Sequence, residues 1–198
     1  MKARFYCLLL LTLALAGCSG MRIIDSEVHA YTVPPGVSVP ATYRFEQLLS
    51  QQARPAQRNQ LEDMVQTELD KVGMRRDDTA AQYSVSFELR VHRDPRSPWD
   101  DPGYGAGFFR GFPIVTRHGV VYPYPGPYFV AEMPWYRREV SLLMRRLSDG
   151  GLVFETHASS DGYWADDAAV IPAMFEAALR DFPNPPPGPR QVNIEIPR

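Results

Sequence analysis

Strict alternation of apolar and polar residues over residues 82–92 is the feature that most restricts the fold of this chain. The odd positions are apolar and the even positions polar, the apolar set being Tyr83, Val85, Phe87, Leu89 and Val91. Because successive side chains of a strand point to opposite faces, the segment predicts a strand with one buried face and one wet face. A sheet of this kind has to be covered on one side by other parts of the chain.

Two amphipathic segments can supply that cover. Residues 55–72 begin with a proline and carry apolar residues at helical spacing, and Gly73 follows as a stop signal. Residues 168–181 carry a second apolar stripe. Pro172 is awkward there, so either this helix begins near Ile171 or the proline sits in its early turns.

Short strands account for most of the remaining pattern. They are expected at residues 25–33, 42–46, 135–147, 152–160 and 191–196, with a tight turn at residues 148–151 joining the third and fourth of these. The order of elements predicts an α+β fold. We expect a two-layer sandwich, in which two amphipathic helices cover one face of a mostly antiparallel sheet.

The N-terminus reads as an export signal. Lys2 and Arg4 precede an apolar stretch over residues 5–16. That stretch is shorter than the roughly 20 residues needed to cross a bilayer, and it fits a signal peptide over residues 1–17. It ends in a run that resembles the lipobox of bacterial lipoproteins, Leu15-Ala16-Gly17-Cys18.

The lipobox resemblance implies that Cys18 receives covalent lipid and becomes the mature N-terminus. The alternative is an ordinary secretory cleavage site with an incidental cysteine. Cys7, the only other cysteine, would be lost with the signal peptide, which leaves no disulfide, thiolate metal site or cysteine nucleophile. Residues 18–24 are then expected to form a tether and residues 25–198 a single domain. Because Ser19 rather than aspartate follows the cysteine, the resemblance implies the outer membrane, on its periplasmic face.

Charge argues against nucleic acid as a partner. The signal peptide carries two basic residues and no acid, so the mature part has 21 − 2 = 19 basic and 23 acidic residues, a net charge of −4. Nucleic-acid binding requires a clustered basic surface, and anionic lipid attracts polybasic segments. The composition predicts neither.

A long Pro/Gly/aromatic-rich loop over residues 94–134 separates the two halves of the predicted sheet. Its 41 residues include 8 prolines, 6 glycines and 9 aromatic residues. Loops of this length without regular structure are usually functional or disordered. Exposed rings can contact a protein, a sugar or a membrane interface. The candidate contact residues are Trp99, Tyr104, Phe108, Phe109, Phe112, Tyr122, Tyr124 and Tyr128. The alternative is that the loop wraps the domain and its rings cover the open sheet face.

Residues that could carry chemistry show no pattern typical of a catalytic or metal site. The histidines are isolated, without HxH or HxxxH spacing: His29, His92, His118 and His157. Paired acids occur at residues 77–78, 100–101 and 166–167. Asp166 and Asp167 precede a predicted helix, where capping and the helix dipole explain them. Only Asp100 and Asp101, beside Trp99, are candidates for a hydrolase. No catalytic residue, metal or cofactor is therefore expected, apart from the covalent lipid.

The arrangement of elements resembles a bacterial lipoprotein family. It includes Tyr43-Arg44-Phe45 ahead of a helix, a helix ending at Lys71-Val72-Gly73 before an alternating strand, the hairpin over residues 142–154, and a helix ending at Arg180-Asp181-Phe182-Pro183. Together these features resemble the DUF4136 family over about residues 25–182. The family usually has tryptophan where this chain has Phe154. The resemblance implies an envelope lipoprotein with this α+β fold, and it implies no catalytic residues.

The first functional hypothesis is a non-enzymatic, membrane-anchored envelope module, which binds a protein or peptidoglycan partner through the open sheet face and the 94–134 loop. One alternative is a carrier that holds an apolar small molecule between helices and sheet. A further alternative is a cell-wall hydrolase that uses acids of the loop.

Overall fold

A seven-stranded sheet organises the molecule in the computed structural model, which describes residues 20–47, 55–94, 114–116, 119–121 and 134–197. The strand order is β3-β2-β4-β7-β8-β1-β9. The strands are β1 Met21–Thr32, β2 Ala41–Phe45, β3 Met74–Arg76, β4 Tyr83–Asp94, β7 Trp135–Arg146, β8 Leu152–Gly162 and β9 Arg190–Pro197. Only the pairings of β2 with β3 and β4 are parallel; the other ladders are antiparallel.

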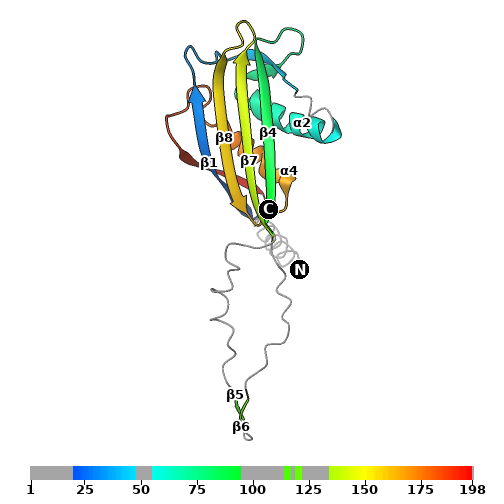
Figure 1. The fold of residues 1–198 in the computed structure, drawn as a ribbon, viewed down its shortest axis with the longest axis vertical. Coiled ribbons are helices and arrows are strands. Elements are labelled where there is room, and N and C mark those ends of the chain that lie inside the picture. Colours follow the sequence, from blue (N-terminus) through cyan, green and yellow to red (C-terminus); the bar gives the residue numbers. More distant parts are fainter. Residues whose placement is uncertain (1–19, 48–54, 95–113, 117–118, 122–133, 198) are drawn as a thin grey trace, which may run out of the picture.

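Two helices, α2 (Pro55–Lys71) and α4 (Asp167–Ala178), cover one face of the sheet. The helix α4 packs on β1, β7, β8 and β9, and α2 packs on α4 and β3. Both helices lie behind the sheet in Figure 1. The predicted α+β fold, with two helices on a mostly antiparallel sheet, is therefore confirmed. Within the described ranges, neither helix is both long and apolar enough to cross a bilayer.

The core lies between the helices and the inner face of the sheet. Four rings form a chain of edge-to-face contacts from Tyr43 through Phe45 and Phe87 to Phe175, with ring centroids 5.2, 5.2 and 6.4 Å apart. The buried Thr156 hydroxyl of β8 donates to the carbonyl of Ala178 at 2.9 Å. This bond satisfies a carbonyl in the last turn of α4, which has no partner within the helix.

The apolar positions of residues 82–92 are buried in the first half of β4 only. Tyr83, Val85 and Phe87 are buried, and so is Ser84 on the other face, whereas Val91 is 42% exposed. The strand therefore extends beyond the part of the sheet that the helices cover, and its last residues are open to solvent on both faces. The neighbouring strand β7 buries Val140, Leu142 and Met144 as expected.

Several predicted boundaries were wrong. The strand β1 begins at Met21, so residues 21–24 of the predicted tether belong to the sheet. The second helix ends at Ala178, not residue 181, and Pro172 is its sixth residue, within its early turns. The short strand β3 was not predicted. The 94–134 segment is not wholly irregular, because β5 (Ile114–Thr116) and β6 (Gly119–Val121) form a two-stranded antiparallel sheet within it.

Two ends of the sheet differ in which chain segments reach them. At the Met21 end, β1 begins and β9 ends, since Met21 pairs with Pro197. The strand β4 ends and β7 begins at the same end, where Asp94 pairs with Trp135 (Figure 1). The opposite end, the Gly150 end, carries the turn between β7 and β8, in which Gly150 has a φ of 70°. Both connections to residues 95–133 therefore leave from the Met21 end.

Candidate functional site

The residues that the sequence nominated lie outside the described ranges. This applies to Leu15, Ala16, Gly17 and Cys18, to Asp100 and Asp101, and to all eight contact aromatics of the 94–134 loop. The candidate site consists of other residues.

The Met21 end carries four aromatic side chains, here called the ring cluster: Trp135, Tyr136, Tyr163 and Trp164. Tyr163 stands between the two indoles, with its ring centroid 5.9 Å from that of Trp135 and 5.2 Å from that of Trp164. The indole Nε1 of Trp135 donates to Asp161 at 3.1 Å. The register of β7 on β8 produces this meeting, since Tyr136 pairs with Gly162.

Two buried arginines hold the ring cluster from the helix side. Arg22 of β1 pairs with Asp166 at 2.8 Å, and its guanidinium lies 4.9 Å from the centroid of the Trp164 ring. Arg138 of β7, only 2% exposed, pairs with Asp167 and donates to the carbonyl of Trp164, each at 2.6 Å. The segment from Trp164 to the start of α4 is thereby fixed to two strands.

The expectation that Asp166 caps α4 was wrong. Asp166 occupies the N-cap position, but its side chain makes no capping hydrogen bond and instead binds Arg22. Asp167 stands in the first turn, where its charge also suits the helix dipole. Charge pairing with distant strands therefore replaces the local cap.

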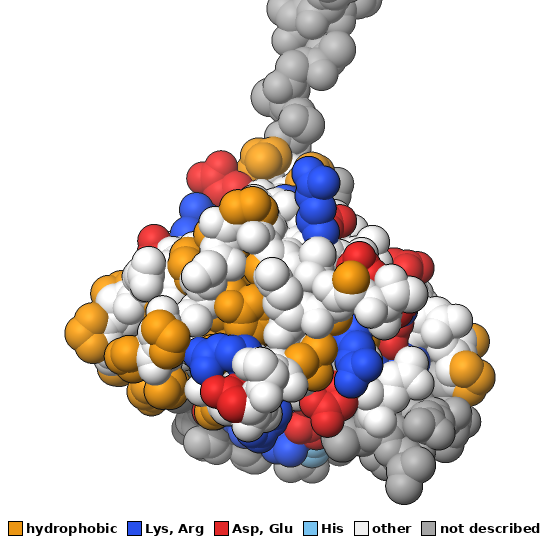
Figure 2. All heavy atoms as spheres, turned by 90° about the horizontal axis from the view of Figure 1, so that it is seen from above, with side chains coloured by type: hydrophobic (Ala, Val, Ile, Leu, Met, Phe, Trp, Pro, Cys, Tyr) orange, Lys and Arg blue, Asp and Glu red, His pale blue; other side chains and the backbone are white. Residues whose placement is uncertain are grey.

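The ring cluster is accessible at its outer side. Tyr163 is 56% exposed, and the neighbouring outward-facing residues of β1, Met21 and Ile23, are 50% and 52% exposed. Rings with apolar bodies and polar tips suit an environment that is apolar on one side and wet on the other. Toward the Gly150 end, the exposed large hydrophobic residues are Tyr31, which is 55% exposed, and the aliphatic residues Val33, Val39 and Leu147, and hydrophobic side chains are interspersed with charged and polar ones (Figure 2).

Sequence reasoning missed the ring cluster, although a signal was available. The predicted turn at residues 148–151 sets the register of the hairpin, and Trp135 and Tyr163 are equidistant from Asp149 (149 − 135 = 14 and 163 − 149 = 14). Each has a second aromatic residue beside it, Tyr136 or Trp164. Extending the hairpin to both dipeptides predicts that they meet.

The open face of the sheet brings together two histidines that the sequence kept apart. His29 and His157 are cross-strand partners of β1 and β8. Each binds an acid two residues earlier on its own strand, Glu27 at 3.3 Å and Glu155 at 2.7 Å. Within the described ranges, no three His, Cys, Asp or Glu side chains form a group that could hold a metal ion. The exposed positions agree with the expectation that these histidines lie on the surface.

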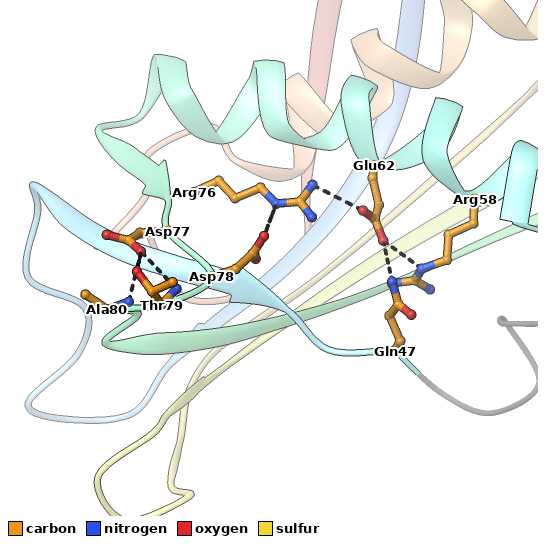
Figure 3. A network of polar contacts seen from close by, with 8 residues as sticks. All are labelled: Gln47, Arg58, Glu62, Arg76, Asp77, Asp78, Thr79 and Ala80. Atoms are coloured by element: carbon orange, nitrogen blue, oxygen red, sulfur yellow. Dashed lines mark hydrogen bonds and ion pairs between the residues drawn. The ribbon is translucent and has the colours of Figure 1, made fainter.

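A second polar cluster lies beneath α2, where the helix meets β2 and β3 (Figure 3). Buried Glu62 accepts hydrogen bonds from Arg58 at 2.7 Å, Gln47 at 3.4 Å and Arg76 at 3.2 Å. Arg76 also contacts Asp78 at 3.3 Å. Because both oxygens of Glu62 are used and its partners come from three segments, the cluster fastens the helix to the sheet.

A tight turn beside this cluster contains the other acid of the 77–78 pair (Figure 3). Asp77 Oδ1 accepts from the backbone amides of Thr79 and Ala80, both at 2.9 Å, and from the Thr79 hydroxyl at 2.8 Å. Hydrogen bonds from Ala80 and Thr79 hold the pKa of the Asp77 carboxyl below its usual value. This acid stabilises a turn, and the arrangement supplies no pair of carboxylates across a substrate.

A groove of about 830 Å³ lies along the second half of β4. Its walls come from α2, β4, β7 and α4, and they include Leu61, Met64, Leu89, Val91 and Ile171 together with polar residues. A small apolar molecule in this groove would contact both helices and the sheet.

Comparison with known proteins gives one family match. The family described as "Domain of unknown function (DUF4136)" matches residues 31–184. No protein of curated function matches the chain significantly.

Several solved structures are similar to this chain at low sequence identity. A PDZ domain protein from Parabacteroides distasonis has 13% identity and a TM-score of 0.49, over 93% of this chain and 41% of that one. Two crystal forms of the PelC dodecamer from Paraburkholderia phytofirmans have 11% and 10% identity and TM-scores of 0.42 and 0.43. In both, the match covers 78% of this chain and 94% of the other. This chain therefore spans less than half the length of the PDZ domain protein.

Proposed function

This chain belongs to the DUF4136 family, and from that premise we propose that it is a lipid-anchored, non-enzymatic binding module of the cell envelope. Cys18 carries the lipid, and the domain faces the periplasm from the outer membrane. Its partner is an envelope protein or peptidoglycan. No cofactor or catalytic residue is assigned.

One observation carries the proposal: the sheet begins immediately after the predicted lipidation site. Only Ser19 and Gly20 separate Cys18 from Met21, the first residue of β1. An extended chain spans about 3.3–3.6 Å per residue, so the start of β1 can lie at most roughly 10 Å from the Cys18 backbone. A lipid on Cys18 would hold the Met21 end of the sheet at the membrane surface.

The same end is where residues 95–133 connect to the sheet, through Asp94 and Trp135. The aromatic segment proposed to contact a partner is therefore tethered, at both of its ends, on the membrane side of the domain. This supports a partner that lies close to the bilayer. A short tether would not bring the Gly150 end to that partner.

Lipidation is tested by metabolic labelling with a fatty-acid probe. The wild-type chain is expected to take up label and to fractionate with the outer membrane, and Cys18→Ser is expected to do neither. Cys7→Ser is the matched control and should label like the wild type, because Cys7 is removed with the signal peptide. Label on Cys18→Ser would contradict the proposed anchor.

Partner binding is tested by crosslinking in cells, followed by mass spectrometry. A variant lacking residues 96–132 should remain folded and lipidated, because its sheet and helices are intact, but should lose its specific crosslinks. If the two forms recover the same proteins and the same peptidoglycan fragments, the 95–133 segment is not the contact surface.

A second candidate function is carriage of an apolar small molecule, which the groove along β4 favours. Native mass spectrometry of the purified protein should then show a co-purifying mass, and Met64→Arg should abolish it by placing a charge in the groove wall. An unliganded spectrum from protein isolated under mild conditions would eliminate this alternative. The hydrolase alternative predicts turnover of isolated peptidoglycan that Asp100→Ala with Asp101→Ala abolishes.

A further inference from the structure

We propose that the ring cluster, together with exposed Met21 and Ile23, rests in the headgroup region of the phospholipid bilayer, so that the sheet stands on the membrane by its Met21 end. This inference rests on the proposed lipid anchor and goes beyond it. The anchor supplies proximity, whereas the ring cluster supplies a second contact that fixes the orientation of the domain.

The short chain between Cys18 and β1 limits how far the Met21 end can lie from the lipid. With two residues between Cys18 and β1, the Met21 end cannot move more than roughly 10 Å from the anchored backbone. Interfacial regions of a bilayer add several ångströms of depth on each side of the hydrocarbon core. Side chains that project from this end are therefore within reach of the headgroup layer.

The side-chain types at the Met21 end suit a membrane–water interface. Tryptophan and tyrosine are enriched at membrane–water interfaces, because their rings prefer an apolar environment and their polar tips prefer a wet one. The outer side of this end combines the half-buried indole of Trp135 with the exposed side chains of Tyr163, Met21 and Ile23. Toward the Gly150 end, the exposed large hydrophobic side chains are one aromatic ring, Tyr31, and the aliphatic residues Val33, Val39 and Leu147, whereas the contacting rings of Trp135, Tyr163 and Trp164 lie at the Met21 end.

The side chains of the ring cluster are held in place by neighbouring residues. Trp135 is held by its bond to Asp161, Tyr163 by rings on both sides, and Trp164 by its contacts with Arg22 and Arg138. A contact surface that is already ordered loses little conformational entropy when it binds. The arginines that hold it are paired with Asp166 and Asp167. Contact of the Met21 end with the bilayer therefore depends on the rings more than on net charge.

The experiment uses the lipidated protein reconstituted in phosphatidylethanolamine vesicles. Single cysteines for spin labels are introduced at Ala165, which is exposed beside Trp164, and at Ser148, which is exposed at the Gly150 end. Under the proposed function the mature chain has no other free thiol. Collision with oxygen reports apolar surroundings, and collision with a water-soluble nickel complex reports water.

The expected result is a severalfold higher oxygen-to-nickel ratio at Ala165 than at Ser148, with little change when the salt concentration is raised. Replacing the outer rings, Trp135→Ala with Tyr163→Ala, should lower the ratio at Ala165 to the value at Ser148. The matched control, Tyr31→Ala with Val33→Ala, removes comparably exposed side chains near the other end and should leave the ratio unchanged. Circular dichroism checks that each variant is folded.

The proposal is overturned if Ala165 and Ser148 give equal ratios in a protein that carries the fatty-acid label. It is also overturned if the Ala165 label responds only to added peptidoglycan fragments, which would assign the rings to a saccharide. Failure of the anchor gives a different result: the protein takes up no fatty acid, and it is not retained on the vesicles at all.

Discussion

Adjacent arginines of β7 have opposite environments, and the difference shows how a single residue organises this end of the molecule. Arg138 faces the helices, is 2% exposed, and binds both Asp167 and the Trp164 carbonyl. Arg137 points to the open face and is exposed. Strand side chains alternate between faces. Arg137 is therefore a surface charge, whereas Arg138, one residue later, is a buried link between the strand and the start of α4.

We predict that Arg138→Met lowers the free energy of unfolding by about 1–3 kcal/mol, the cost of losing buried hydrogen bonds that involve a charged group. The half-exposed Asp167 can be hydrated, which keeps the loss below that of a fully buried ion pair. Urea unfolding measures the effect. Arg137→Met serves as the control and should change stability by less than about 0.5 kcal/mol; equal losses for the two variants would contradict this account.

Asp77 should make the stability of its turn dependent on pH. Its pKa is lowered by hydrogen bonds from Ala80 and Thr79, so the folded state favours the ionised form. The stabilisation is present above the ordinary aspartate pKa of about 3.9 and is lost as the pH falls through the lowered value.

We therefore expect Asp77→Ala to be less stable than the wild type at pH 7, and the two to converge in strongly acidic solution. Thermal unfolding across this range measures the difference. Thr79→Val removes only the hydroxyl bond and should give a smaller effect of the same sign. A difference that stays constant with pH would show that the carboxylate charge does not contribute.

Elements with a clear apolar period were predicted, and elements defined by polar residues were not. The hairpin of β7 and β8 follows from buried apolar residues such as Val140 and Leu142, and from the turn that contains Gly150. The start of β1 was missed because its inward positions include Arg22 and Ser26, whereas Met21 and Ile23 point outward. That pattern is the reverse of the usual one.

The short strand β3 was missed for a different reason. It has three residues, two of them arginines, and pairs only with β2 in a parallel ladder. The arginine partners of Asp166 and Asp167 were also beyond sequence reasoning, because the fold brings together residues that are far apart in the chain. Local sequence indicates caps and turns, whereas Arg22 lies 144 residues from Asp166.

The end of α2 depends on Gly73, as the sequence predicted. Gly73 has a φ of 86°, in the left-handed region that residues with a Cβ avoid. We predict that Gly73→Ala costs about 1–2 kcal/mol of stability, and that Gly73→Asn costs less, because asparagine tolerates this conformation. Chemical denaturation measures both. Equal stability of Gly73→Ala and the wild type would mean that the helix end can rearrange without loss.

At the scale of the whole molecule, the arrangement of strands places five chain segments at the Met21 end. Strands β1, β4, β7, β8 and β9 all begin or end there. The antiparallel ladders make this a consequence of topology, since each strand reverses the direction of its neighbour. The proposed anchor, the ring cluster and the aromatic 95–133 segment thus belong to one side of the domain.

Lengthening the tether separates the contribution of the anchor from that of the ring cluster. Inserting about 10 Gly/Ser residues after Gly20 adds a flexible linker with an r.m.s. length near 17 Å. We predict that lipidation is unchanged and that the spin label at Ala165 keeps part of its high oxygen-to-nickel ratio, because the rings still contact the bilayer. Combining the insertion with Trp135→Ala and Tyr163→Ala should lower the oxygen-to-nickel ratio at Ala165 to the value at Ser148. If the insertion alone lowers the oxygen-to-nickel ratio at Ala165 to the value at Ser148, the short tether and not the rings holds this end at the membrane.

The position of β1 has a mechanical consequence. It is the sixth strand of seven in the sheet and is bonded on both sides, to β8 and to β9. A force that pulls on the chain before Met21 acts along the axis of this strand, so its hydrogen bonds in both ladders are loaded in shear and have to break together rather than one after another. Stretching from this terminus is therefore resisted by a strand that is hydrogen-bonded to a neighbour on each side.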